Sequence, residues 1–327
     1  MTITVVAKDK IARVLDFGTT ILLSGEIQKD TPRKLRAVLD GIPRDDSWTY
    51  VQFDSLGGNL YAAMEIGRML RAKGAITQIG GGEGVKGQPK PAVCLSACSL
   101  AFLGGRYRYS APGSVYGVHR ASSSAAPSSS DLDVGPIVAA ATATYLLDMG
   151  VDTRLLELSV KAGKDGMYLL SEGELKNLGV VNNGRMDAAW SIEVVEGGTY
   201  LRGVQETVWG EGKILFSCVG PVFQMMSVYT AGSAKAVAVA AGGWTHSMFV
   251  DNETVALGRP QRLQASGEYI NASFTLQASA LRKVAAAAKV GHAMQLSPDA
   301  PTYLGYQVDI DAKSRAKVST YVGNCLR

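Results

Sequence analysis

The sequence lacks the long apolar runs and the blocks of like charge that mark membrane-spanning and nucleic-acid-binding proteins. Its longest apolar candidate, Ala234 to Ala241, is much shorter than the roughly 18 residues of a membrane span and contains Lys235. The formal net charge is +4, and basic clusters such as Arg106 to Arg108 are short, which is typical of solvated surface. We therefore expect no membrane span and no nucleic-acid partner.

A secretory leader is also missing from the N-terminal segment. Met1 to Lys10 has no charged start followed by an apolar core and a small-residue cleavage site. This pattern predicts a cytoplasmic protein, or a periplasmic one if a leader precedes this start.

Cysteine and histidine are scarce, with four and three residues respectively. Cys94 and Cys98 flank a serine, whereas Cys218 and Cys325 lie near the two ends of the C-terminal part. We interpret all four as reduced thiols that pack as small hydrophobic residues. A long-loop disulfide between Cys218 and Cys325 is the alternative for an oxidising compartment. Cys94 and Cys98 are alternatively an oxidisable pair beside Ser96. No cluster of His, Cys and carboxylates has the spacing of a metal site, so we expect neither a metal nor a cofactor.

Residues 1–187 alternate between strand-like and helix-like segments, which predicts an α/β domain with parallel pairing. Strands are expected at 20–25, 49–53, 75–79 and 114–118, and helices at 31–39, 60–73, 96–103 and 137–160. Residues 80–91 and 121–135 have the composition of loops. The second loop directly follows His119, so it is either a lid or a simple surface insertion.

Residues 188–327 contain mostly strand-like runs, which predicts a smaller β-rich α+β domain. The sequence does not indicate the role of this domain. A hairpin is expected over 199–217 with its turn at Gly210 to Gly212, and one short helix over 280–289. Further strands are expected at 247–250, 273–277 and 303–310. His246 and His292 have no partner nearby in sequence, so we expect them to be structural or exposed.

The segment Cys94-Leu95-Ser96-Ala97-Cys98-Ser99 is the strongest functional signal. It lies between an upstream Asp54-Ser55-Leu56-Gly57-Gly58 segment and a downstream histidine, His119. Acyl-transfer chemistry needs a nucleophile, a base and backbone N–H groups that face an oxyanion. Serine, histidine and a glycine turn supply these groups.

The order of these motifs resembles the Clp protease proteolytic subunit family, and most closely its Clp-like relatives in bacterial envelopes. Asp54 to Asn59 stands where that family has Asn-Ser-Pro-Gly-Gly, and Ser96-Ala97 stands where it has its catalytic serine. Ser114 to His119 is similar to the family's strand that ends in the base. Tyr168 to Val181 is similar to its Leu-Ser, acidic-helix and Gly-Leu-Val ending. The resemblance covers about residues 15–187.

This resemblance implies the spiral of ββα units shared by Clp proteolytic subunits and crotonases. It also implies that Ser96 is the nucleophile, that His119 is the general base and acid, and that the Ala97 N–H lines the oxyanion hole. A second oxyanion donor would be the N–H of Gly57 or Gly58, because glycine lets the backbone approach the reacting carbonyl.

The third member of the triad is assigned by the same resemblance. Asp165 is the nearest acid before the Leu-Ser motif, two residues further upstream than the family's spacing, and Asp152 is the alternative. Two features depart from the Clp subunits, namely Leu56 in place of proline and the cysteines around Ser96. Ser99 lies one turn further along the predicted helix, so it should point away from the oxyanion donors.

The sequence therefore predicts a serine hydrolase, most simply a peptidase that acts on peptides or proteins without a cofactor. By family analogy it should form a homo-oligomer, and no feature names an ATPase partner. Two alternatives stay open: a catalytically inactive Clp-like scaffold that binds a protein partner, and an acyl-CoA-processing enzyme with a crotonase fold.

Overall fold

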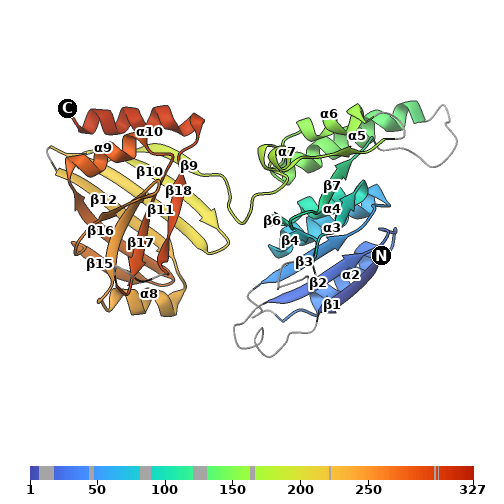
Figure 1. The fold of residues 1–327 in the computed structure, drawn as a ribbon, viewed down its shortest axis with the longest axis horizontal. Helices are drawn as coiled ribbons and strands as arrows, with labels where there is room; N and C mark the ends of the chain where they lie inside the picture. The colour runs from blue at the N-terminus through green and yellow to red at the C-terminus, as the bar shows by residue number, and fades with distance from the viewer. Residues whose placement is uncertain are drawn as a thin grey trace. The chain divides into compact units, whose positions relative to one another are not determined.

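The computed structural model describes residues 1–6, 18–43, 48–81, 90–120, 131–162, 166–220, 222–297, 300 and 302–327, with residues 131–134 described by their backbone alone (Figure 1). The chain divides into two compact units, Met1–Gly184 and Arg185–Arg327. The first unit combines strands with helices, and the second consists mainly of strands. The protein is therefore a mixed α/β protein with several sheets.

The central sheet of the first unit has five strands in the order β1-β2-β3-β4-β6. They are β1 (Thr2–Val6), β2 (Thr19–Ser24), β3 (Thr49–Asp54), β4 (Ile76–Ile79) and β6 (Tyr107–Ser110). Strands β2, β3, β4 and β6 pair in parallel, whereas β1 joins β2 as an antiparallel edge strand. Parallel pairing is what strand–helix alternation predicts.

A second, three-stranded sheet consists of β5 (Val93–Leu95), β7 (Val115–Val118) and β8 (Tyr168–Leu169). It meets the extension of β3 through a bridge between Ser55 and Cys94. The Ser55 N–H donates to the Val93 carbonyl at 2.8 Å, and the Leu95 N–H donates to the Ser55 carbonyl at 3.0 Å. This bridge brings the segment that follows β3 next to the end of β5.

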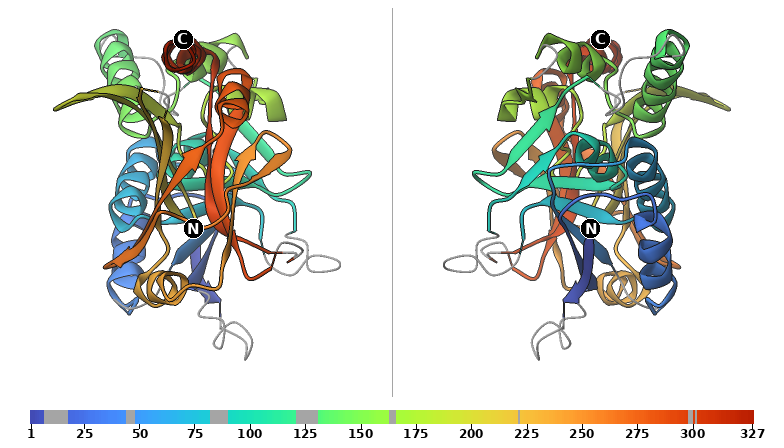
Figure 2. Two further views of the ribbon diagram at one scale, coloured as in Figure 1. Left: turned by 90° about the vertical axis from the view of Figure 1, so that its left-hand side faces the viewer. Right: turned by 90° about the vertical axis from the view of Figure 1, so that its right-hand side faces the viewer.

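The described helices of the first unit are α2 (Thr31–Asp40), α3 (Leu60–Lys73), α4 (Ala97–Leu103), α5 (Asp131–Asp148), α6 (Arg154–Lys161) and α7 (Glu172–Asn177). Helices α2 and α3 lie along one face of the central sheet (Figure 2). Helix α3 begins at Asn59, whose side chain accepts the Ala62 N–H at 2.9 Å, and ends at Gly74 in the left-handed conformation. Its inner side buries Ile66 and Leu70 completely.

The helical region predicted over 137–160 is two helices, because the chain leaves α5 at Gly150 with a φ of +63°. Helix α5 also begins earlier than expected, so the last part of the loop predicted over 121–135 is helical. Residues 121–130 of that loop lie outside the described residues, as do 82–89 of the loop predicted over 80–91.

The prediction that Arg106 to Arg108 form solvated surface is wrong for Arg108, which is 3% exposed in β6. Its guanidinium donates to the carbonyls of Gly179 at 2.7 Å, Val180 at 2.9 Å and Gly105 at 2.9 Å. A buried cation is tolerated when its N–H groups find acceptors, and a guanidinium has five of them. Arg108 thereby ties β6 to the end of the first unit.

The second unit has two antiparallel sheets, ordered β15-β16-β12-β11-β10-β9 and β14-β13-β17-β18. The strands are β9 (Ala189–Val195), β10 (Gly198–Thr207), β11 (Gly210–Val219), β12 (Val222–Thr230), β13 (Thr245–Val250), β14 (Glu253–Ala256), β15 (Arg262–Ser266), β16 (Tyr269–Leu276), β17 (Lys289–Gln295) and β18 (Leu304–Asp309). The described residues of this unit form three helices where one was predicted: α8 (Ser233–Ala240), α9 (Ala278–Ala286) and α10 (Ala312–Cys325). Helix α9 ends at Ala286, short of the predicted end at 289, because the backbone becomes extended at Ala287.

The hairpin of β10 and β11 turns at Val208 and Trp209, since Thr207 pairs with Gly210. The turn predicted at Gly210 to Gly212 is therefore misplaced, and both glycines lie inside β11. A side chain at Gly212 would stand 2.0 Å from the Tyr306 ring, so glycine is required there by close packing.

Both histidines of the second unit are buried in its core and contact each other. His246 Nδ1 lies 3.1 Å from His292 Nε2, and His292 Nδ1 lies 2.8 Å from the Ser227 hydroxyl. That hydroxyl also accepts the Tyr306 O–H at 2.9 Å. Burial lowers the pKa of both imidazoles, and the pKa of His292 falls to about 3. The two histidines are structural and uncharged at neutral pH.

The prediction of four reduced thiols is wrong, because the cysteines form the disulfides Cys94–Cys98 and Cys218–Cys325. The second bond joins β11 to the last residue of α10 across a sequence separation of 107. Helix α10 is also held by Tyr321, whose hydroxyl donates to the Thr199 carbonyl at 2.7 Å. The long-loop alternative for Cys218 and Cys325 therefore describes this pair.

Candidate active site

Ser96 lies on a sharp turn between β5 and α4. Its backbone has a φ of 57° and a ψ of −128°, which L-residues adopt only under restraint and at a cost of about 1–3 kcal/mol. The Ser96 N–H donates to the Gly117 carbonyl of β7 at 3.0 Å. The strand, the strained turn and the helix leave Ser96 half-buried, whereas the residues of α4 that follow it are buried.

His119 follows β7 and faces this serine. Strands β5 and β7 pair in parallel with Leu95 opposite Gly117, so the residues just after them lie side by side. The Ser96 Oγ and His119 Nε2 atoms are 2.6 Å apart, which is hydrogen-bonding distance. The structure thus brings together the serine and the histidine that the sequence singled out. With the proton of His119 on Nδ1, Nε2 accepts the serine hydroxyl.

Gly57 and Gly58 approach the same turn from the other side. A side chain at Gly57 would meet the Ser96 Cβ at 2.6 Å and the Ala97 nitrogen at 3.0 Å. One at Gly58 would meet the Ile27 carbonyl oxygen at 2.2 Å. Both glycines also have positive φ, of 109° and 134°. The glycine pair is therefore required by backbone conformation and by close approach.

The backbone donors at this turn differ in their partners. The Gly57 N–H donates to the Ser55 hydroxyl at 3.1 Å. Among the described residues, the N–H groups of Gly58 and Ala97 have no hydrogen-bond acceptor.

Ser99 does not share the exposure of Ser96. It is 2% exposed, and its hydroxyl donates to the Ser96 carbonyl at 2.5 Å. Its own carbonyl accepts the buried Tyr116 hydroxyl at 3.3 Å, and burial raises the pKa of that tyrosine. Ser99 and Tyr116 therefore stabilise the turn from the buried side, through hydrogen bonds to the backbone of residues 96 and 99.

The structure leaves the predicted acid open. Asp165 lies outside the described residues, and no described residue hydrogen-bonds to His119 Nδ1. The alternative, Asp152, pairs with Arg154, with an Oδ2–Nη2 distance of 2.7 Å, and the same contact lowers the pKa of its carboxyl. In the antiparallel pair of β7 and β8, Val118 lies opposite Tyr168.

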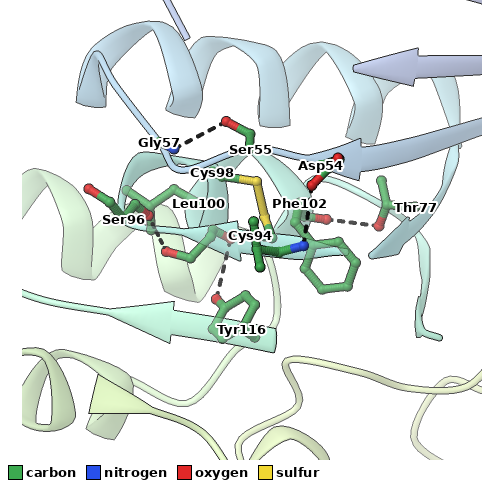
Figure 3. The surroundings of a disulfide bond; sticks show 12 residues. Asp54, Ser55, Gly57, Thr77, Cys94, Ser96, Cys98, Leu100, Phe102 and Tyr116 are labelled. Atoms are coloured by element: carbon green, nitrogen blue, oxygen red, sulfur yellow. Dashed lines mark hydrogen bonds between the residues drawn. A yellow bond between two sulfur atoms is a disulfide. The ribbon is translucent and has the colours of Figure 1, made fainter. Parts of the chain in front are cut away.

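The disulfide Cys94–Cys98 links the residues on the two sides of the turn that carries Ser96. Both half-cystines are fully buried, and the bond links β5 to the first turn of α4. Figure 3 shows the disulfide with Ser55 and Gly57 on one side and Tyr116 on the other. The two cysteines are four residues apart in sequence, but spacing alone does not distinguish packed thiols from a disulfide.

Sequence reasoning missed the role of Ser55, whose hydroxyl holds the Gly57 N–H and whose backbone bridges to Cys94. Ser55 lies in the segment that resembles the Asn-Ser-Pro-Gly-Gly motif, but its pairing with Cys94 joins segments far apart in sequence, so the motif alone does not reveal it. Over the described ranges, no group of three or more His, Cys, Asp or Glu side chains could hold a metal ion. Within the same ranges, no helix is long and apolar enough to cross a membrane.

No family model matches the chain, and no curated protein matches it. Among solved structures, the chain is similar to one described as the 1510-N membrane-bound stomatin-specific protease in a serine-to-alanine mutant form. The two share 18% sequence identity, and the match covers 49% of this chain and 75% of that chain with a TM-score of 0.37. At this level of similarity the overlap says nothing about the activity of the chain.

Proposed function

We propose that the first unit is a serine hydrolase that cleaves peptide bonds in peptides or proteins. The observation that carries this proposal is the 2.6 Å contact between Ser96 Oγ and His119 Nε2 at a strained strand–helix turn. The order of strands and helices around that turn also supports the spiral of ββα units that Clp proteolytic subunits and crotonases share.

In the proposed mechanism, His119 Nε2 takes the Ser96 hydroxyl proton while Oγ bonds to the substrate's carbonyl carbon. The carbonyl oxygen becomes an oxyanion and accepts hydrogen bonds from the N–H groups of Ala97 and Gly58. His119 then gives its proton to the leaving amine as the C–N bond breaks. Water, deprotonated by His119, releases the acyl group and restores the serine.

We propose Asp165 as the residue that orients His119 through Nδ1. The pairing of Val118 with Tyr168 supports this role, since it brings the segment just before Tyr168 to the end of β7 that carries His119. Asp152 is a weaker candidate because its carboxylate already binds Arg154. Without an acid the site would act as a Ser–His dyad with a lower rate.

A fluorophosphonate probe tests this proposal directly. We expect the probe to label the intact chain at Ser96, identified by mass spectrometry of the digested protein, and Ser96→Ala to remove the label. His119→Ala should slow labelling by about a thousandfold while leaving thermal unfolding unchanged. A folded protein that is not labelled would support the inactive-scaffold alternative, and displacement of a bound coenzyme A analogue would support the acyl-CoA alternative.

Two further properties belong to this proposal. The disulfides support an oxidising compartment, which corresponds to the periplasmic alternative. Alkylation of the unfolded chain, isolated without reductant, should then find no free thiol. Self-association into a homo-oligomer stays a prediction from the family resemblance, and light scattering of the purified chain measures it.

A further inference from the structure

The Cys94–Cys98 disulfide closes a small covalent ring around the turn that carries Ser96. Cys94 is the central residue of β5, and Cys98 lies in the first turn of α4. The bond therefore fixes the strand before the serine to the helix after it. Both half-cystines have 0% exposed surface, so the disulfide lies beneath the turn and not at the mouth of the site.

This turn needs a restraint that its local interactions supply only in part. Ser96 has a backbone conformation that non-glycine residues avoid, and α4 has seven residues, too few for a helix that is stable alone. The hydrogen bonds on the Ser96 backbone are the N–H bond to Gly117 and the bonds that its carbonyl accepts from Ser99. A covalent link across the turn limits how far β5 and α4 can separate.

We propose that Cys94 and Cys98 are positioning residues for the serine nucleophile. Their disulfide holds Ser96 Oγ toward His119 Nε2 and keeps the Ala97 N–H, which lies inside the ring, aimed at the acyl oxygen. This inference rests on the proposed function, since it requires Ser96 to be the nucleophile. The sulfur atoms act through Ser96 and Ala97 and do not meet the substrate.

The test compares the rate constant of fluorophosphonate labelling in the full chain and in the double variant Cys94→Ala/Cys98→Ala. We expect the rate constant to fall at least tenfold, because a small displacement of a nucleophile has a large effect on its rate. With an activated ester as substrate, kcat should fall similarly while KM changes less than about twofold. The fraction of molecules finally labelled should stay the same, whereas a merely structural role would lower that fraction and leave the rate constant unchanged.

The matched control is Cys218→Ala/Cys325→Ala, which removes the other disulfide and should leave the labelling rate unchanged. If Cys94→Ala/Cys98→Ala does not fold, the Cys94→Ser/Cys98→Ser variant replaces it, because serine is close to cysteine in size. Equal rate constants in wild type and a folded variant would overturn this inference. Failure of the wild type to label at all would instead overturn the proposed function.

Discussion

Gly57 lies so close to Ser96 that a methyl group at position 57 would stand 2.6 Å from the Ser96 Cβ. Gly57→Ala should therefore shift the turn that carries Ser96. The backbone at position 57 has a φ of 109°, so alanine there also adds backbone strain. We expect fluorophosphonate labelling to slow by about a hundredfold or more, since Ser96 and the proposed oxyanion donors move apart.

Gly25→Ala is the matched control for this change. Gly25 also has a positive φ, of 86°, but a side chain there would meet nothing within 4 Å. It should lose about 1 kcal/mol of stability and keep the wild-type labelling rate. Equal labelling rates in the two variants would show that the approach of Gly57 to Ser96 has no effect on reactivity.

Arg108 should be a major contributor to the stability of the first unit. Replacing it by methionine keeps much of its apolar volume but removes the side-chain donor to the carbonyls of Gly179 and Val180. We expect a loss of about 3 kcal/mol in the free energy of unfolding, measured by urea denaturation. Arg36→Met, which breaks an exposed ion pair with Glu65, should cost less than about 1 kcal/mol. The assignment fails if the two variants unfold at the same urea concentration.

The second unit should lose stability in acid because of His292. Its pKa is about 3 in the folded protein and 6.5 when unperturbed, so the unfolded chain binds the proton first. The free energy of unfolding should be at its full value above pH 6.5 and decrease by up to about 1.4 kcal/mol per pH unit as the pH falls toward 3. The groups facing this imidazole are His246, Ser227 and Tyr306.

Hydrogen exchange of β17 amides across this pH range measures the effect in the second unit alone. His292→Gln keeps a polar side chain next to Ser227 but does not titrate. The pH slope should therefore decrease in that variant, whatever its stability at neutral pH. An unchanged slope would assign the acid sensitivity to other groups.

Cys325→Ala should destabilise the second unit by about 2–5 kcal/mol, since the Cys218–Cys325 bond closes a long loop. Thermal unfolding by calorimetry measures the loss. The double variant with Cys218→Ala should be no less stable than the single variant, because both remove the same bond. Additive losses from the two substitutions would mean that each cysteine contributes through packing and not through the disulfide.

The sequence was most informative where a residue's role depends on its near neighbours. Helix α3 was predicted with its observed bounds, because Gly74 ends a regular apolar pattern. The order of the Gly57 turn, Ser96 and His119 was likewise sufficient to select two side chains that prove to be in contact. The assignment of Asp165 as the acid stays a prediction, because Asp165 lies outside the described residues.

Features that depend on distant partners were misread. Arg108 looked like surface because a guanidinium that is satisfied by backbone carbonyls has no signature in the sequence. Gly212 looked like part of a turn, but the Tyr306 ring that excludes a side chain there comes from β18. The four cysteines were interpreted as reduced thiols, with the Cys218–Cys325 bond only as an alternative, because a pairing of cysteines depends on where the fold places them.

The bridge between Ser55 and Cys94 joins two segments that lie far apart in sequence, one after β3 and one that contains β5, and the candidate site draws residues from both. One segment carries Gly58, a proposed oxyanion donor, and the other carries the proposed nucleophile Ser96 together with the second proposed donor, Ala97. An insertion of one residue between Phe53 and Gly57 would shift the Gly58 N–H relative to Ser96. The contact of Ser96 with His119 would stay in place, because both residues lie on other segments. A relative of this chain could thus lose the Gly58 N–H from the proposed oxyanion hole and still keep the contact between serine and histidine, so that contact alone would not identify an active relative.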